Sequence, residues 1–279
     1  METVTTVAGL RMALAKTRKS GKRVGFVPTM GYLHKGHVAL IEASRAQSDA
    51  TVVSIFVNPT QFGPNEDLNT YPRDFLRDER QCRDAGVSIL FAPDAREVYP
   101  GGFETLVEPS ELTKSLCGAF RPGHFRGVAT VVCKLFNMVQ PDVAFFGQKD
   151  FQQCAVVRRM AIDLDLSVEI VTVQTVREPD GLAMSSRNRF LNEEQRQRAL
   201  AISRALFAAE AEFKAGEREV DALLEIAKRQ LERVDLLQYA ELVEVDTLKP
   251  AESPLRRPAV FCVAAYVGGT RLIDNVILN

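Results

Sequence analysis

The 279-residue sequence has little histidine and lacks the cysteine patterns of metal-binding and disulfide-rich proteins. It contains three histidines and five cysteines, and no two cysteines have C-x-x-C spacing. An odd number of cysteines without that spacing argues against a disulfide framework or a zinc site. We therefore expect free thiols in a reducing cytoplasm. The cysteines are Cys82, Cys117, Cys133, Cys154 and Cys262.

Long apolar runs and a strong charge of one sign are also absent. The longest apolar run, residues 259–267, is far below the ~20 residues that cross a bilayer. The first residues show no basic region followed by an apolar stretch, so no signal peptide is expected. The net charge is −1, which excludes a global basic field for nucleic acid or anionic membrane. We expect a cytoplasmic protein in which any phosphate is bound at a local site.

Alternating apolar and helical patterns indicate an α/β fold over the first two-thirds of the chain. Between the third and fourth predicted strands, apolar residues from Val128 to Val139 recur with helical spacing. Strands separated by helices favour right-handed crossovers and a Rossmann-like, doubly wound parallel sheet. The predicted strands are residues 24–29, 52–57, 87–91, 143–146 and 168–173.

The pattern changes after about Arg177 and predicts a smaller α+β domain. Residues 192–195 are typical of an N-cap and first turn, and the helix they begin should end before Gly216. The glycine pair at 268–269 predicts a hairpin turn between the last two strands. We therefore expect domains 1–176 and 177–279. The other predicted elements are a helix near 220–233 and strands at 237–243, 260–267 and 271–278.

Polar clusters follow four of the predicted strands, the last of them after an intervening segment at 176–181. They are residues 34–37, 58–63, 147–153 and 184–187. The carboxyl ends of parallel strands lie at the same edge of a sheet, and ligands of open α/β sheets bind there. We therefore expect the four clusters to converge on one crevice.

The residue types in these clusters suit a polyphosphate. His34 and His37 are three residues apart, so they share a face of one helical turn and can both donate to phosphate oxygens. Lys149 can neutralise charge on a phosphoryl group, and Arg187 adds a fork of donors beside two serines. Each also has a structural alternative: a hydrogen-bonded histidine, a solvated lysine or an ordinary loop. Because both G-x-x-x-x-G-K-[ST] and G-x-G-x-x-G are missing, the His-x-Gly-His turn would have to hold the phosphates.

Other candidates carry weaker signals. Gln61 and Gln153 can orient an alcohol or carboxylate without adding charge, but surface glutamines are the alternative. Asp78 and Glu79 could hold Mg²⁺ through water, although a solvated helix face is the preferred interpretation. The segment 121–127 could bring basic residues to the site, yet its glycines and proline fit a plain turn equally well.

Residues 28–37, 56–62, 146–153 and 180–188, taken together and in order, resemble the pantothenate synthetase family. The His-x-Gly-His motif alone would indicate only the wider nucleotidyltransferase superfamily, which includes class I aminoacyl-tRNA synthetases. A tRNA synthetase is disfavoured because no basic anticodon-binding extension appears.

The resemblance implies ATP-dependent joining of pantoate to β-alanine through a pantoyl adenylate, with release of AMP and pyrophosphate. It also implies Mg²⁺ accompanying ATP, a homodimer, an ATP- and pantoate-binding domain at 1–176, and a domain at 177–279 that covers the site. The resemblance does not identify protein ligands for Mg²⁺.

The resemblance also implies roles for individual residues. His37 matches the proton donor, and Gln148 departs from the glutamate that many relatives carry. The implied pantoate residues are Gln61, also near β-alanine, and Gln153, with Asn58 in the substrate site. The implied catalytic residues are His34, His37, Lys149 and Arg187. The implied ATP-binding residues are Met30, Gly31, Tyr32, Leu33, His34, Lys35, Gly36, His37, Gly147, Gln148, Lys149, Asp150, Val176, Met184, Ser185, Ser186 and Arg187.

Two other functions stay open at this point. A plain adenylyltransferase would stop after joining AMP to an acceptor, and a nucleotide-binding regulator would keep the pocket without turnover. The stretch 61–78, with Gly63-Pro64-Asn65, is either a lid over the adenylate or a rigid loop.

Overall fold

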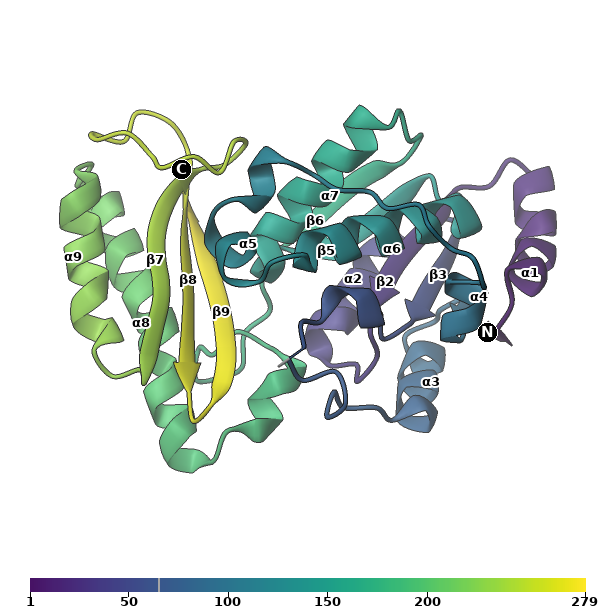
Figure 1. The fold of residues 1–279 in the computed structure, drawn as a ribbon, viewed down its shortest axis with the longest axis horizontal. Helices are drawn as coiled ribbons and strands as arrows, with labels where there is room; N and C mark the ends of the chain where they lie inside the picture. The colour runs from purple at the N-terminus through teal and green to yellow at the C-terminus, as the bar shows by residue number, and fades with distance from the viewer. Residues whose placement is uncertain (65) are drawn as a thin grey trace. The chain divides into compact units, whose positions relative to one another are not determined.

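The computed structural model describes residues 1–64 and 66–279, in two compact units (Figure 1). The first unit comprises Met1–Ser110, Arg121–Gly147 and Gln153–Gln174. The second comprises Glu111–Phe120, Gln148–Gln152 and Thr175–Asn279. The units are therefore not two continuous stretches of the chain. Asn65, part of the expected lid, lies outside the described residues.

The first unit is built on a six-stranded parallel sheet with strand order β1-β4-β3-β2-β5-β6, which confirms the α/β prediction. Its strands are β1 (Glu2–Val4), β2 (Val24–Thr29), β3 (Ala50–Ile55), β4 (Ile89–Phe91), β5 (Val143–Gly147) and β6 (Glu169–Val173). The helices along this part of the chain are α1 (Val7–Lys19), α2 (Lys35–Gln47), η1 (Pro59–Gln61), α3 (Phe75–Asp84), α4 (Ala95–Val98), α6 (His124–Val139) and α7 (Phe151–Asp163).

Helices cover both faces of this sheet because its strands are apolar on both sides. Val27 of β2 and Phe145 of β5 share an apolar cluster with Ile41 of α2. The neighbouring strand residue, Phe26, points the other way and meets Phe136 of α6, with ring centroids 6.3 Å apart. The largely apolar, buried central strands are the signal that made the sheet predictable.

Strand β1 was not predicted from the sequence. It has three residues, is largely exposed, and pairs in parallel with β4. A strand that short, without apolar alternation, has no period to detect.

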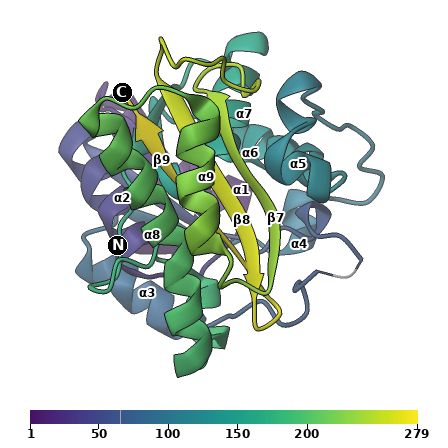
Figure 2. The same cartoon turned by 90° about the vertical axis from the view of Figure 1, so that its left-hand side faces the viewer.

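The second unit contains a three-stranded antiparallel sheet that packs against two helices (Figure 2). Asn192 is the N-cap as predicted and forms a capping box with Gln195, and Gly216 ends the long helix in the left-handed region. Gly268 and Gly269 form the predicted hairpin turn with φ of +58° and +78°. The elements are η2 (Glu111–Thr113), α5 (Leu116–Phe120), η3 (Gln148–Asp150), η4 (Ser186–Phe190), α8 (Glu193–Ala215), α9 (Val220–Leu231), β7 (Leu236–Glu244), β8 (Ala259–Val267) and β9 (Thr270–Leu278).

Two features of the described chain bear on the sequence expectations. No disulfide bond joins any of the five cysteines, and four of them are buried. Within residues 1–64 and 66–279, every helix is too short or too polar to cross a membrane.

Candidate active site

Two histidines cap the helix that follows β2. His34 is the N-cap of α2, and its Nδ1 accepts the backbone N–H of Gly36 at 3.1 Å. The Nδ1 of His37 in turn accepts the backbone N–H of His34 at 3.2 Å. Because Nδ1 is an acceptor in both rings, each neutral imidazole carries its proton on Nε2. Two Nε2–H donors therefore stand beside the amides of a helix N-terminus, which is an arrangement suited to an anion.

The turn before this helix is held by a buried carboxylate. Asp78 is 1% exposed; its Oδ2 accepts the amide of Tyr32 at 2.6 Å and its Oδ1 the amide of Leu33 at 2.7 Å. Gly31 and Tyr32 both adopt positive φ, so the turn is tight and its amides point inward. Burial raises the pKa of the Asp78 carboxyl, and the two amides oppose that rise.

The expectation of a solvated helix face for Asp78 is therefore wrong. The residue lies on the same face of α3 as Cys82, four positions on, which is fully buried. The four-residue spacing of Asp78 and Cys82 could have indicated a buried face of α3. The other residues of this helix are mostly charged, so the sequence pattern did not indicate that face. Glu79, the neighbouring candidate, instead accepts a hydrogen bond from Thr3 at 2.7 Å.

The carboxyl end of β3 carries a buried amide pair. Gln61, 9% exposed, donates from Nε2 to the Met30 sulfur at 3.2 Å and accepts from Asn58 at 3.1 Å. Asn58 is 1% exposed and also donates to the carbonyl of Gly127 on α6 at 3.1 Å. A Cβ on Gly127 would lie 2.4 Å from the Thr60 carbonyl oxygen, so only glycine allows α6 to come this close. Surface glutamine, the alternative for Gln61, is excluded by this burial.

The third histidine lies against the same segment, although sequence reasoning assigned it no clear role. The Nδ1 of His124 lies 2.8 Å from the Gln61 carbonyl oxygen, and Nε2 lies 2.9 Å from Arg121 Nη1. A carbonyl can only accept and a guanidinium can only donate, so the ring is neutral with its proton on Nδ1.

Arg121 adds a second anchor through its fork of donors. It makes bonds of 2.7 and 2.6 Å to the two carboxylate oxygens of Glu66. Burial alone would raise the pKa of Glu66, but the bonds and charge of Arg121 lower it below its ordinary value. Residues 121–123 form the turn before α6, which begins at His124, and the side chains of Arg121 and His124 both contact the backbone carbonyl of Gln61.

The Lys149 segment and the serine–arginine segment both belong to the second unit, where each contacts β9. Lys149 lies in η3, its side chain is 19% exposed, and its Nζ is 4.0 Å from the Asp150 carboxylate. In the other segment, the amide of Met184 donates to the carbonyl of Val176 at 3.0 Å. Ser185 caps η4 by accepting the amide of Arg187 at 3.2 Å. The structure thus brings Val176 to Met184, and Ser185 to Arg187.

The remaining predicted residues lie at the borders of the units. Gly147 ends β5 in the first unit, Gln148 begins the second, and Gln153 on α7 returns to the first. Gln152, beside it, is 5% exposed and donates to the carbonyls of Leu112 and Ser115, at 2.8 Å each. Convergence of all four polar clusters on one crevice stays a prediction, since it would join residues of both units.

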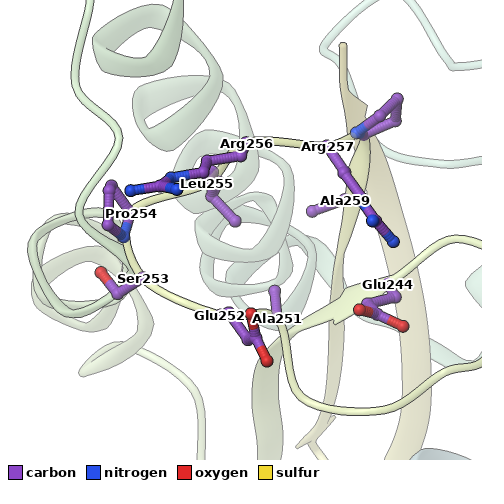
Figure 3. A pocket seen from close by; sticks show the side chains of 10 residues that line it. Glu244, Ala251, Glu252, Ser253, Pro254, Leu255, Arg256, Arg257 and Ala259 are labelled. Atoms are coloured by element: carbon purple, nitrogen blue, oxygen red, sulfur yellow. The ribbon is translucent and has the colours of Figure 1, made fainter.

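A hollow of about 610 Å³ lies elsewhere in the second unit (Figure 3). It is lined by Glu244 and residues 251–259, so it contains none of the predicted site residues. Arg256 and Arg257 point in different directions there and do not converge on one ligand. Among the described residues, no three His, Cys, Asp or Glu side chains are grouped to hold a metal ion.

Comparisons with known proteins cover the whole chain. The model of the pantoate-beta-alanine ligase family matches residues 2–277. The chain is 72% identical over 279 residues to pantothenate synthetase 1 of Bradyrhizobium diazoefficiens, covering 100% of this chain and 99% of the relative. It is 51% identical over 279 residues to pantothenate synthetase of a Sulfurihydrogenibium species, covering 99% of each.

Solved structures give the same assignment. Pantothenate synthetase from Thermus thermophilus superposes with a TM-score of 0.93 at 49% identity, over 99% of each chain. The pantoate-beta-alanine ligase of Francisella tularensis, complexed with beta-gamma ATP and beta-alanine, gives a TM-score of 0.81 at 32% identity, over 99% of this chain and 97% of that one. By sequence and by fold along its whole length, this chain belongs to the pantoate-beta-alanine ligase family.

Proposed function

We infer that this chain is a ligase that joins pantoate to β-alanine with consumption of ATP, giving pantothenate, AMP and pyrophosphate. The observation that carries the inference is the family match over residues 2–277, which spans both compact units. The relative from Francisella tularensis binds an ATP species and β-alanine, which are two of the three expected substrates.

ATP is proposed to bind at segments from both units. The Nε2–H groups of His34 and His37 and the amides at the start of α2 supply donors for phosphate oxygens. Lys149 and Arg187 supply the positive charge that a neutral imidazole pair lacks. The proposed ATP-binding set is the one implied by the resemblance: residues 30–37, 147–150, 176 and 184–187.

Pantoate is proposed to bind beside Gln61, Gln153 and Asn58. The Gln61 side-chain amide is held by Asn58 and by the Met30 sulfur, and the His124 ring contacts the backbone carbonyl of Gln61. A fixed neutral amide can orient a hydroxyl or carboxylate with little loss of entropy on binding. β-Alanine would then enter close to Gln61.

The reaction proceeds in two half-reactions. A carboxylate oxygen of pantoate attacks the α-phosphorus, the bond from that phosphorus to the bridging oxygen breaks, and pyrophosphate leaves. The amine of β-alanine then attacks the activated carbonyl, the bond from that carbon to the phosphate oxygen breaks, and AMP leaves as the amine loses a proton. We propose that His34, His37, Lys149 and Arg187 stabilise the charge on the phosphoryl oxygens. His37, at the position of the family's proton donor, does so as a neutral ring that donates its Nε2–H as a hydrogen bond and keeps the proton.

Mg²⁺ is proposed to arrive with ATP. Among the described residues, no three His, Cys, Asp or Glu side chains are grouped to hold a metal ion without the help of substrate or water. This fits an ion that keeps several waters and is held mainly by substrate phosphates. When bound it would neutralise charge on the leaving pyrophosphate.

We propose that 1–176 forms an ATP- and pantoate-binding domain and that 177–279 covers the site. A homodimer and a cytoplasmic location are also proposed, on the family resemblance and the composition respectively.

The test is exchange of labelled pyrophosphate into ATP without β-alanine. We expect exchange that requires pantoate, followed by pantothenate formation when β-alanine is added. A plain adenylyltransferase would show exchange without amide formation, and a nucleotide-binding regulator would show neither. Either of those two results would overturn the inference.

A further inference from the structure

The side chain of Asn275, on β9, makes its hydrogen bonds to the short helix η3. Its Nδ2 donates to the backbone carbonyls of Gln148 at 2.8 Å and Lys149 at 3.0 Å. Its Oδ1 accepts from Gln148 Nε2 at 3.2 Å. One amide thus uses both of its N–H groups and its oxygen on two consecutive residues.

This contact is buried, which restricts the side chains that can replace asparagine at position 275. Asn275 is 2% exposed, so loss of its amide would leave two backbone carbonyls without these donors in a region closed to water. No aliphatic side chain can replace it. The three-residue helix η3 is the single turn that joins the end of β5 to the start of α7, and Asn275 bonds to its backbone carbonyls from β9.

The preceding residue, Asp274, holds the other segment of the second unit that is proposed to bind ATP, residues 176–187. The Asp274 carboxylate, 4% exposed, accepts from the Arg177 guanidinium at 2.6 and 3.0 Å. Arg177 also donates to the Gly181 carbonyl at 3.2 Å and lies 4.7 Å from the Phe207 ring centroid. Successive residues of a strand point to opposite faces, so β9 holds one loop on each side.

We propose that Asn275 is a positioning residue for ATP: it fixes the backbone of Lys149 so that the ammonium meets the phosphates. The proposal rests on the role of Lys149 in the proposed function. The ammonium is 4.0 Å from its neighbour Asp150, a long contact that does not set its direction. The ammonium also interacts electrostatically with Asp274, and because its side chain extends from η3, a shift of that backbone displaces it from the phosphates.

The test compares Asn275→Ala and Asn275→Leu with Leu272→Ala in the full-length protein. Leu272 lies on the same strand, is 6% exposed, and packs in the apolar core of the second unit, so its loss destabilises without touching η3. We expect each Asn275 variant to lower kcat/KM for ATP about 10- to 100-fold, because small misplacements of a reacting group cost that much. Leu272→Ala should lower it less than about threefold below its melting temperature.

A double-mutant cycle with Lys149→Ala separates positioning from general damage. If Asn275 acts through Lys149, Asn275→Ala should cost little more once Lys149 is alanine, within about twofold. A full additive loss in the double variant would overturn the proposal. So would an Asn275→Ala enzyme no more impaired than Leu272→Ala.

Amide hydrogen exchange gives a readout that does not depend on activity. The amides of residues 148–152 should exchange at least about tenfold faster in Asn275→Leu than in the parent, while those of α8 should not change. Unchanged exchange at 148–152 would contradict the proposal even if a variant is too unstable for kinetics. The single variant Lys149→Ala tests the proposed function separately. Normal activity of Lys149→Ala would contradict the assigned role of Lys149. A large loss of activity in Lys149→Ala, together with normal activity of the Asn275 variants, would contradict only the positioning role of Asn275.

Discussion

His37 accepts the backbone N–H of His34 through Nδ1, and the two imidazole centroids lie 4.1 Å apart. The histidine that caps the helix is thus itself held by the second histidine, and both rings carry their proton on Nε2. This reciprocal cap explains why the spacing of three residues matters: N-cap and third helical residue are the positions that face each other.

Replacing His37 by alanine should lower turnover by about a hundredfold, because loss of one preorganised donor costs about 3 kcal/mol of transition-state stabilisation. The fold should survive, since His34 still caps α2 through Gly36. The measurement is kcat at saturating substrates, with thermal unfolding as the control. Near-normal turnover would refute the assigned role of His37.

Asp78→Asn should destabilise the protein by about 1 to 3 kcal/mol and also reduce kcat, because an amide places N–H donors against the amide of Tyr32 or Leu33. Asp74→Asn is the matched control: Asp74 caps the same helix by accepting the Arg77 amide, and asparagine caps equally well. Urea unfolding of both variants checks this. Equal stability of the two variants would show that Asp78 does not hold the turn.

The ion pair of Glu66 with Arg121 should make part of the stability depend on pH. Arg121 lowers the pKa of Glu66 in the folded state, so the carboxylate stabilises the protein above its unfolded pKa, and that stabilisation is lost as pH falls through the lower, folded value. Glu66→Gln should therefore cost about 1 to 2 kcal/mol at pH 7 and progressively less below about pH 4.

Unfolding by denaturant at several pH values measures that difference. Glu108→Gln is the control, since the Glu108 side chain is 64% exposed and its pair with Arg126 is 3.7 Å long, so it should contribute little at any pH. A Glu66→Gln penalty that stays constant from pH 7 to pH 3 would be inconsistent with this pair.

The stretch 61–78 is either a lid that closes over the bound substrates or a rigid loop, and proteolysis with and without substrates distinguishes the two. Its two ends are fixed by the buried Gln61 and Asp78, so any movement must occur between them. ATP with pantoate should slow proteolysis within this stretch, and ATP alone should slow it less. If the substrates give no protection, the stretch is a rigid loop.

The sequence predicted the sheet, the long capped helix and the closing hairpin because each has a local signal: continuous apolar runs, Asn192 with Gln195, and Gly268-Gly269. Strand ends differed from prediction by at most two residues, as at Ala50–Ile55. The exposed β1 has no such signal, because its pairing with β4 joins residues far apart in the chain.

In the candidate site, too, only residues with a local signal could be predicted from the sequence. Residues with chemical character in a short motif, such as His34 and His37, could be identified from the sequence. Residues that hold the motifs could not, because their role depends on burial and long-range partners. Asp78 is 45 positions from Leu33, and Asn275 is 126 from Lys149.

The most direct test of the account follows an oxygen atom. Pantoate labelled with ¹⁸O in its carboxylate is incubated with ATP, β-alanine and the enzyme, and the products are analysed by mass spectrometry. Attack on the α-phosphorus predicts one ¹⁸O in AMP and none in pyrophosphate. Unlabelled AMP, or label in pyrophosphate or inorganic phosphate, would contradict a pantoyl adenylate and with it the proposed chemistry of this site.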